Sequence, residues 1–376
     1  MIILMRKFVF RKKICTFEKL CIVMKQLLLK IASILYGLGL RVRHWMFDVG
    51  MLHSEKYDIP VLCVGNITVG GTGKTPAVEM LVGYYAKTHN VAVVSRGYGR
   101  KTKGYLEVSV EDSYIDVGDE PLQIKRKFPN VPVIVCEKRV YAIERIREQM
   151  PDVNMIIMDD GFQHRFVQPY LNIIMVDASR PVERDHLLPY GQLRDTISSL
   201  HRAHYFIVTK CPDDMTPIQM RIQRKVLTFK PSQQVFFTRF KRSVMRTLIE
   251  DRPMPMVAGS KVIAMSGIGN SEVFNEDLRS RFNVVETLDF EDHHTYRLGD
   301  LALMQKALER NPDAVIITTE KDAVKLFNSR KIPAEVSSRI LYESVELAFV
   351  DGTNEFFQKL DKDIKQHNND GYIRGC

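Results

Sequence analysis

A glycine-rich segment that ends in lysine and threonine carries the clearest chemical signal in the sequence. It reads Val69-Gly70-Gly71-Thr72-Gly73-Lys74-Thr75 and lies between an apolar run, 61–65, and an amphipathic segment, 77–87. A strand, a glycine-rich turn and a helix in this order are typical of a P-loop, whose backbone N–H groups and helix N-terminus bind phosphate oxygens. Lys74 is expected to contact the β- and γ-phosphates of ATP, and the Thr75 hydroxyl to hold Mg²⁺. Thr68 stands where such loops usually begin with glycine, and a turn that binds nothing is the alternative.

Acidic residues follow a second apolar run. Residues 154–158 are mostly apolar and lead directly into Asp159-Asp160-Gly161-Phe162-Gln163-His164. Acidic side chains at the tip of a buried strand have the form of a Walker B element, in which an aspartate helps to hold Mg²⁺. Asp-Asp-Gly is also a good turn sequence, so a plain turn is the alternative. Because a P-loop precedes them, we favour Asp159 and Asp160 as metal ligands.

Other polar segments are candidates for substrate contacts. Arg96 begins a loop with two glycines after the apolar run 91–95, and Arg194 ends the irregular apolar segment 187–194. Loops at the carboxyl ends of strands are where α/β sheets bind ligands. We therefore assign Arg96, Gln163, His164 and Arg194 to the substrate, with solvated turns and a crossover loop as alternatives.

The elements that would position these residues form an alternating pattern. Apolar runs at 61–65, 91–95, 133–136, 154–158, 171–177 and 205–210 alternate with helical segments. This alternation predicts an α/β fold with a mostly parallel sheet and helices on both faces. Residues 235–240 resemble an extended link, and a second, smaller α/β unit is expected to contain strands at 262–265, 284–287 and 314–318.

Length and composition agree with this division. A chain of 376 residues is long for one core, and 45% hydrophobic with 26% charged residues is a globular composition. We expect a P-loop domain at 51–234, a smaller α/β domain with extended linkers at 235–345, and a segment at 346–376 that returns to the first domain as a helix and then frays. Six scattered cysteines without a CxxC pair indicate a reducing compartment and no structural zinc.

The N-terminal region is basic and apolar. Ten of its first fifty residues are Lys or Arg and two are acidic, so it carries +8 of the net charge of +9. Apolar residues recur at helical spacing from Leu28 to Trp45, and the uncharged stretch 31–40 is too short to span a bilayer. We expect an amphipathic helix at 24–50, either in an anionic membrane interface or packed on its own domain. Residues 1–23 are an uncertain extension, and Met24 is an alternative start.

Taken in order, these motifs resemble those of one family, the tetraacyldisaccharide 4′-kinases, also called lipid A 4′-kinases. The matching residues lie between about 24 and 350 and are Gly70-Gly71-Thr72-Gly73-Lys74-Thr75-Pro76, Ser95-Arg96-Gly97-Tyr98-Gly99, Gly118-Asp119-Glu120-Pro121, Asp159-Asp160-Gly161-Phe162-Gln163-His164, Asp292-His293-His294 and Thr319-Glu320-Lys321-Asp322. The run from Asp159 to His164 directly after a strand is the most specific of them.

The resemblance implies transfer of the γ-phosphate of ATP to the 4′-hydroxyl of an acylated glucosamine disaccharide 1-phosphate, a lipid A precursor. It implies a peripheral enzyme at the cytoplasmic face of the bacterial inner membrane, with its site between a larger P-loop domain and a smaller α/β domain. The family's Asp–His pair, which activates the sugar hydroxyl, matches Asp119 and His293, with His294 as the alternative histidine. A carboxylate or imidazole that takes the hydroxyl proton is also what this chemistry needs.

Two other functions compete with the lipid kinase. A membrane-recruited P-loop ATPase switch would have no sugar substrate, and the second domain with its Asp-His-His segment argues against it. A nucleic-acid-binding ATPase would suit the basic leader, but the leader lacks the interleaved aromatic residues of single-strand binders. We therefore expect ATP and Mg²⁺, a lipid substrate, no nucleic acid and a monomer.

Overall fold

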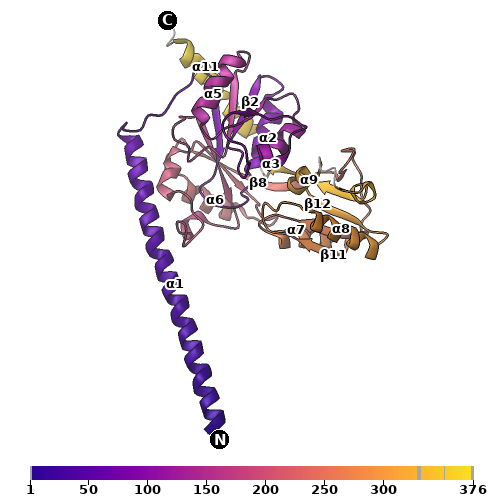
Figure 1. The fold of residues 1–376 in the computed structure, drawn as a ribbon. Coiled ribbons are helices and arrows are strands. Elements are labelled where there is room, and N and C mark those ends of the chain that lie inside the picture. The colour runs from indigo at the N-terminus through magenta and orange to yellow at the C-terminus, as the bar shows by residue number, and fades with distance from the viewer. Residues whose placement is uncertain (1, 328–331, 351, 374–376) are drawn as a thin grey trace.

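The computed structural model describes residues 2–327, 332–350 and 352–373. Two α/β units lie beside each other, and a long helix, α1 (Ile2–Asp48), runs along one side of the larger unit and extends beyond it (Figure 1). This arrangement confirms the predicted class, an α/β fold with a P-loop type of sheet, a smaller α/β unit and an N-terminal helix.

The larger unit contains a nine-stranded sheet in the order β14-β8-β7-β6-β1-β5-β2-β4-β3. Its strands are β1 (Val61–Gly65), β2 (Val91–Ser95), β3 (Leu106–Glu107), β4 (Val133–Val135), β5 (Met155–Asp159), β6 (Leu171–Asp177), β7 (Tyr205–Thr209), β8 (Gln234–Arg242) and β14 (Val345–Phe349). Its helices are α2 (Lys74–Tyr85), α3 (Tyr114–Val117), α4 (Asp119–Lys127), α5 (Arg139–Gln149), α6 (Pro217–Leu227) and α11 (Thr353–Ile373), with short 3₁₀ turns η1 (Val182–Arg184) and η2 (Ile197–Arg202).

The seven strands from β8 to β4 are parallel, and the edge strands β14 and β3 are antiparallel to their neighbours. Alternate side chains of each strand enter separate cores. Helices α2, α4 and α11 cover one core, and α5 and α6 cover the other. Because β1, β5 and β2 are neighbours and parallel, the loops after them meet at one edge of the sheet.

The smaller unit has a five-stranded sheet in the order β11-β10-β12-β13-β9, parallel except for β9. Its strands are β9 (Arg246–Thr247), β10 (Lys261–Ser266), β11 (Asn283–Asp289), β12 (Val315–Thr319) and β13 (Ile340–Glu343), and its helices are α7 (Ser271–Arg281), α8 (Leu298–Arg310), α9 (Glu320–Leu326) and α10 (Ala334–Ser337).

The connection between the units differs from the expected extended link at 235–240. These residues belong to β8, a strand of the large sheet that pairs with β7 on one side and β14 on the other. Arg242 at the end of β8 is paired with Val345 at the start of β14. Residues 243–344 therefore form an insertion between two paired strands, and the sheet topology assigns 235–242 to the first unit, contrary to the expected boundary at 235.

The C-terminal segment also differs from expectation. The end of the chain was expected to fray after a returning helix, but α11 continues to Ile373, and residues 374–376 lie outside the described part. Asp361 accepts hydrogen bonds of 2.9 Å from the Tyr84 and Tyr85 hydroxyls, and Asp363 accepts one of 2.7 Å from Tyr205. Side-chain contacts to the first unit thus support the expected returning helix, which continues farther than its polar composition predicts.

The N-terminal helix packs through its small and polar residues. Ser33 donates a hydrogen bond to the Leu187 carbonyl, and Gly37 is buried where an added Cβ would lie 2.8 Å from a Leu187 methyl group. The apolar row points away from the body, and Leu35 is 63% exposed. By length and composition alone, the segment Ile22–Asp48 could cross a membrane, and 11% of its apolar stretch is buried against the body.

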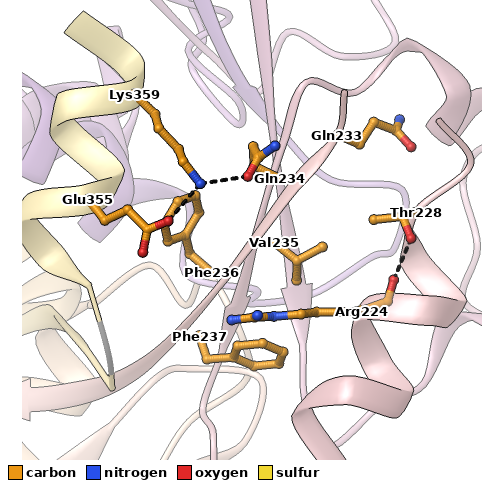
Figure 2. A pocket seen from close by; sticks show the side chains of 9 residues that line it. All are labelled: Arg224, Thr228, Gln233, Gln234, Val235, Phe236, Phe237, Glu355 and Lys359. Atoms are coloured by element: carbon orange, nitrogen blue, oxygen red, sulfur yellow. Dashed lines mark hydrogen bonds and ion pairs between the residues drawn. The ribbon is translucent and has the colours of Figure 1, made fainter. Parts of the chain in front are cut away.

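A cavity of about 180 Å³ lies between α6, β8 and α11 (Figure 2). Lys359 donates hydrogen bonds to Gln234 at 2.8 Å and to Glu355 at 2.6 Å, so its charge is neutralised within the cavity wall. Gln234 pairs with Tyr205, the first residue of β7. The cavity therefore lies near the amino ends of the strands, away from the edge that carries the P-loop.

Candidate functional site

The glycine-rich segment forms a loop between β1 and α2. Gly70 and Gly73 have φ angles of 90° and 86°, which only glycine adopts without strain. The helix begins at Lys74, three residues earlier than the sequence pattern predicts, so its N-terminus directly follows the glycines. Thr68 forms an antiparallel bridge with Leu193, an extended conformation that does not require glycine. This explains how the loop tolerates threonine at its first position.

Asn66, a residue that the sequence analysis missed, organises this loop from beneath. It is fully buried, and its amide nitrogen donates a 2.7 Å hydrogen bond to the Thr72 hydroxyl. Its backbone carbonyl accepts a 2.7 Å hydrogen bond from Gln163, and its side-chain oxygen accepts one from Arg194. Gln163 and Arg194, which were predicted to contact substrate, therefore support the P-loop in this conformation, and their contact with substrate stays a prediction.

The two aspartates after β5 have different surroundings. Asp160, with φ of 47°, accepts a 2.9 Å hydrogen bond from Arg194 and lies 3.8 Å from the Lys74 ammonium. Asp159 accepts a 3.0 Å hydrogen bond from the Ser95 hydroxyl through Oδ2. Its other oxygen, Oδ1, is buried and has no hydrogen-bond partner among the described residues. A buried carboxylate oxygen without a partner next to the P-loop lysine fits a cation ligand.

The pKa values of these two aspartates move in opposite directions. Burial, together with the charges of Glu120 and Asp160, raises the pKa of Asp159 to about 7. Burial would also raise the pKa of Asp160, but Lys74 and Arg194 lower it below its usual value. Asp160 is therefore ionised at neutral pH, whereas Asp159 is poised between its two protonation states.

A buried arginine near the aspartates is a second residue that the sequence analysis missed. Arg139 begins α5 and is 4% exposed. Burial lowers its pKa below the usual value, and the charges of Asp160 and Asp159 offset only part of this effect. Its position shortly after the apolar run at 133–136 could have indicated it, because the carboxyl end of that strand lies at the sheet edge that carries the P-loop. The predicted substrate residue Arg96 is exposed and makes no hydrogen bond or ion pair within the described part of the chain, and its contact with substrate stays a prediction.

His164 is less accessible than a substrate contact would be expected to be. Burial and the nearby charges of Arg139, Arg43 and Arg96 lower its pKa to about 4, so the ring is neutral at physiological pH. Its Nε2 atom is buried and has no hydrogen-bond partner within the described residues. His164 therefore lies beneath the loop surface, and a direct contact with substrate stays a prediction.

Asp119 and His293 meet across the two units. Asp119 is the first residue of α4 and is 5% exposed, and its Oδ2 lies 3.0 Å from Nδ1 of His293 in the loop between β11 and α8. The start of α4 packs closely against the loop after β2 through two glycines. A Cβ added to Gly118 would lie only 3.2 Å from Cα of Gly97, so a side chain there would push the two segments apart. The Tyr98 ring lies 5.4 Å from the His293 ring. The loops after β2 and before α4 thus bring Asp119 to the histidine.

The neighbouring histidine has a different partner. His294 Nε2 lies 3.0 Å from Asp300 Oδ2, and its ring stacks on Phe290 with centroids 4.6 Å apart. Both contacts are within the smaller unit. Of the two histidines, His293 is the one that reaches Asp119, and its role in the Asp–His pair stays a prediction.

Comparison with known proteins identifies the family. The family model described as tetraacyldisaccharide-1-P 4′-kinase matches residues 25–365. The chain belongs to this family. A tetraacyldisaccharide 4′-kinase of Porphyromonas gingivalis strain W83 is 40% identical over 329 residues, which are 85% of this chain and 91% of the relative. One of Parabacteroides distasonis is 36% identical over 351 residues, 89% of this chain and 95% of the relative.

A solved structure supports the same family assignment. The crystal structure of LpxK from Aquifex aeolicus in complex with ATP superimposes with a TM-score of 0.71 at 27% identity, covering 91% of this chain and 99% of that chain. The similarity therefore extends over most of the chain. It confirms that the motifs in the sequence identify a tetraacyldisaccharide 4′-kinase.

Proposed function

We propose that this chain transfers the γ-phosphate of ATP to the 4′-hydroxyl of an acylated glucosamine disaccharide 1-phosphate, a step in lipid A synthesis. Family membership over most of the chain supports the reaction and its two substrates. The observation that carries the mechanism is the 3.0 Å contact between Asp119 of the P-loop unit and His293 of the insertion. That contact joins a carboxylate and an imidazole at the edge where the sheet carries its P-loop.

Asp119 is the base in this proposal. A sugar hydroxyl is a weak nucleophile, so a group must take its proton as the bond to phosphorus forms. Burial would raise the pKa of Asp119, but the His293 hydrogen bond and nearby lysine charges lower it, so the carboxylate is ionised at neutral pH. His293 orients that carboxylate by donating to Oδ2. Oδ1 accepts a 3.0 Å hydrogen bond from the Glu120 backbone N–H, and its second lone pair is the one proposed to take the hydroxyl proton.

The P-loop residues 69–75 cradle the phosphates of ATP. Lys74 supplies charge to the β- and γ-phosphates, and Arg139 and Arg194 add charge near the aspartates. Thr75, Asp159 and Asp160 provide the oxygen ligands that would hold Mg²⁺, which neutralises phosphate charge when bound. The described residues contain no cluster of three or more His, Cys, Asp or Glu that could hold a metal alone, as expected when ATP supplies part of the coordination.

We infer that α1 binds the anionic cytoplasmic face of the inner membrane. Its apolar row is exposed while its small and polar face packs on the body, which favours the interface over the alternative of a helix buried on its own domain. Ser33, Tyr36, Arg43 and His44 hydrogen-bond the body, so these turns cannot enter the bilayer core. One chain supplies both halves of the site, and we therefore propose a monomer.

The test is direct phosphorylation of the sugar. The full chain is incubated with γ-labelled ATP, Mg²⁺ and the acylated disaccharide 1-phosphate, and the position of the label is determined by chemical degradation or NMR. We expect label on the 4′-oxygen, and no transfer by Lys74→Ala, with folding of that variant checked by circular dichroism. ATP hydrolysis that ignores the glycolipid would instead support the ATPase switch.

A further inference from the structure

The imidazole of His293 has a partner on each ring nitrogen. Nδ1 lies 3.0 Å from Asp119 Oδ2, and Nε2 lies 3.0 Å from Nζ of Lys321. A lysine ammonium donates hydrogen bonds and accepts none, so Nε2 must be the acceptor in the second contact. The ring proton is then on Nδ1, where His293 donates it to the Asp119 carboxylate. The two contacts together favour one tautomer of the ring.

Lys321 is held at this position by the first turn of α9 and by three carboxylates. Its side chain is 22% exposed, and its Nζ lies 3.9 Å from Asp119, 3.9 Å from Glu120 and 3.8 Å from Asp292. Asp119 and Glu120 belong to α4 of the P-loop unit, and Asp292 to the insertion. One ammonium thus contacts acidic groups of both units as well as the histidine between them.

A second lysine on the same helix shows that these contacts are particular to Lys321. Lys325 lies 4.0 Å from Asp119, but it is almost completely buried and pairs with Asp322 at 3.2 Å. Its charge is therefore neutralised within α9, whereas the lysine contact of His293 is made by Lys321. Lys321 is the lysine that contacts both members of the pair.

Electrostatics at the pair agree with the geometry. The titratable groups that face it are Tyr98, Tyr114, Glu120, Asp292, Lys321 and Lys325. Burial would raise the pKa of Asp119, but the His293 hydrogen bond and the charges of Lys321 and Lys325 lower it. Loss of the Lys321 charge should therefore raise the pKa of Asp119.

We propose that Lys321 is a positioning residue for phosphoryl transfer, which holds His293 in the tautomer that donates to Asp119. This inference rests on the proposed role of Asp119 and His293. Because Lys321 and His293 come from the insertion and Asp119 from the P-loop unit, the three-residue contact forms only when the two units lie together. Lys321 therefore links the protonation state of the base to the closed arrangement of the units.

The test compares Lys321→Met, which removes the charge at similar length, with Lys321→Arg, which keeps it. We expect kcat of Lys321→Met to fall about 10- to 100-fold, the range seen when groups that orient a metal-bound histidine are removed. The KM values for ATP and the disaccharide should stay within about twofold, and the acidic limb of the kcat profile should move to higher pH. Lys321→Arg should keep the acidic limb of the kcat profile at its wild-type pH and retain much of the wild-type kcat.

Lys306→Met is the matched control, because Lys306 is an exposed lysine on α8 of the same unit, and it should behave as wild type. A direct readout is the ring tautomer in ¹⁵N-histidine-labelled protein, with the His293 signal assigned by His293→Ala. We expect the ring proton on Nδ1 in the wild type. In Lys321→Met we expect a mixture of the two tautomers, or a ring that carries a proton on both nitrogens.

Several results would overturn the proposal. A wild-type ring with its proton on Nε2 would contradict the assigned tautomer directly. A rise in KM with unchanged kcat and pH profile would make Lys321 a substrate contact. Asp119→Asn, measured in parallel, separates the two levels of the argument. If Asp119→Asn keeps full kcat, the proposed base is wrong. If Asp119→Asn is inactive but Lys321→Met has the wild-type pH profile, only the proposed role of Lys321 is wrong.

Discussion

At the scale of single residues, Asp119 and His293 should act as a unit. Asp119→Asn is expected to lower kcat about 10²- to 10⁴-fold at saturating ATP and Mg²⁺, because that is the usual contribution of general-base catalysis. His293→Ala should show a similar loss, and the double variant should lose less than the product of the two. Steady-state kinetics of the four proteins measures this coupling.

His294→Ala is the matched control for this experiment. Its partners Asp300 and Phe290 lie within the insertion, so the variant should lower thermal stability and leave kcat of the folded protein close to wild type. If His294→Ala loses as much kcat as His293→Ala, or if the Asp119 and His293 losses simply multiply, the two residues do not form the proposed pair.

The Mg²⁺ requirement should depend on pH through Asp159. Its pKa is raised to about 7, so below that pH a proton competes with the cation for the carboxylate. The concentration of free Mg²⁺ needed for half-maximal rate should rise about tenfold per pH unit below about 7 and level off above it. Asp159→Asn should remove this dependence, and Asp160→Asn should raise the Mg²⁺ requirement at every pH. A requirement in the wild type that is flat from pH 6 to 8 would contradict the metal assignment.

The sequence predicted the residues that follow apolar strands. Asp159 and Asp160 stand at the end of an apolar run, and Lys74 ends the glycine-rich turn that follows another, so both were expected at the carboxyl ends of strands. Asn66 and Arg139 were missed because their roles depend on burial, and a polar residue beside a strand end is usually solvated. The contact of Lys321 with His293 depends on the packing of α9, which local sequence does not specify.

At the scale of elements, the residues of α1 that dock on the body differ from those proposed to bind the membrane. Arg43 donates a 3.0 Å hydrogen bond to the Gln163 carbonyl and is partly buried, whereas Lys25 and Arg41 are exposed. Replacing Lys25 and Arg41 with alanine should weaken binding to anionic vesicles by about 1 kcal/mol per charge, with the difference disappearing at high salt. Vesicle co-sedimentation at two salt concentrations measures this effect.

Arg43→Ala is the contrasting variant in that experiment. It should keep most of the vesicle binding and instead loosen the helix from the loop that contains Gln163. Removal of residues 2–32, which leaves the docked turns from Ser33 onward, should shift the protein to the soluble fraction. If that shortened protein still sediments fully with vesicles, the membrane anchor lies outside α1.

The sequence anticipated the helices and strands better than their ends or partners. β8 was taken for a link because its mostly apolar sequence, from Val235 to Phe240, fits a strand and an extended connector equally well. Its partner β14 lies more than a hundred residues later in the chain, so the pairing is not visible locally. The end of α11 was expected to fray because it is polar. Its aspartates accept hydrogen bonds from Tyr84, Tyr85 and Tyr205, which lie far away in the sequence and so are not visible locally.

At the scale of the whole molecule, the insertion should be removable. Residues 243–344 can be replaced by an Asn-Gly turn, because Arg242 and Val345 are already paired as in a hairpin. The shortened protein should fold and bind ATP, but it should not phosphorylate the disaccharide because it lacks His293. It should be less stable than the full chain, since Val324 of α9 packs in the core of the P-loop unit.

Thermal unfolding with and without ATP measures this prediction, because a ligand that binds only the folded state raises the unfolding temperature. A shortened protein that folds but shows no shift with ATP would mean that the insertion is part of the nucleotide site. The full chain with Lys74→Ala is the control that should show a reduced shift.

The position of the insertion within the chain also governs the order of events during synthesis. Phe356, Phe357 and Leu360 of α11 lie in the core of the P-loop unit and are made last. At about 5–20 residues per second, the ribosome spends roughly 5–20 seconds on the insertion while that core is incomplete. We therefore expect the insertion to be fully synthesised before the core of the P-loop unit can close, so that a chain still being made should not turn over ATP before its insertion is present.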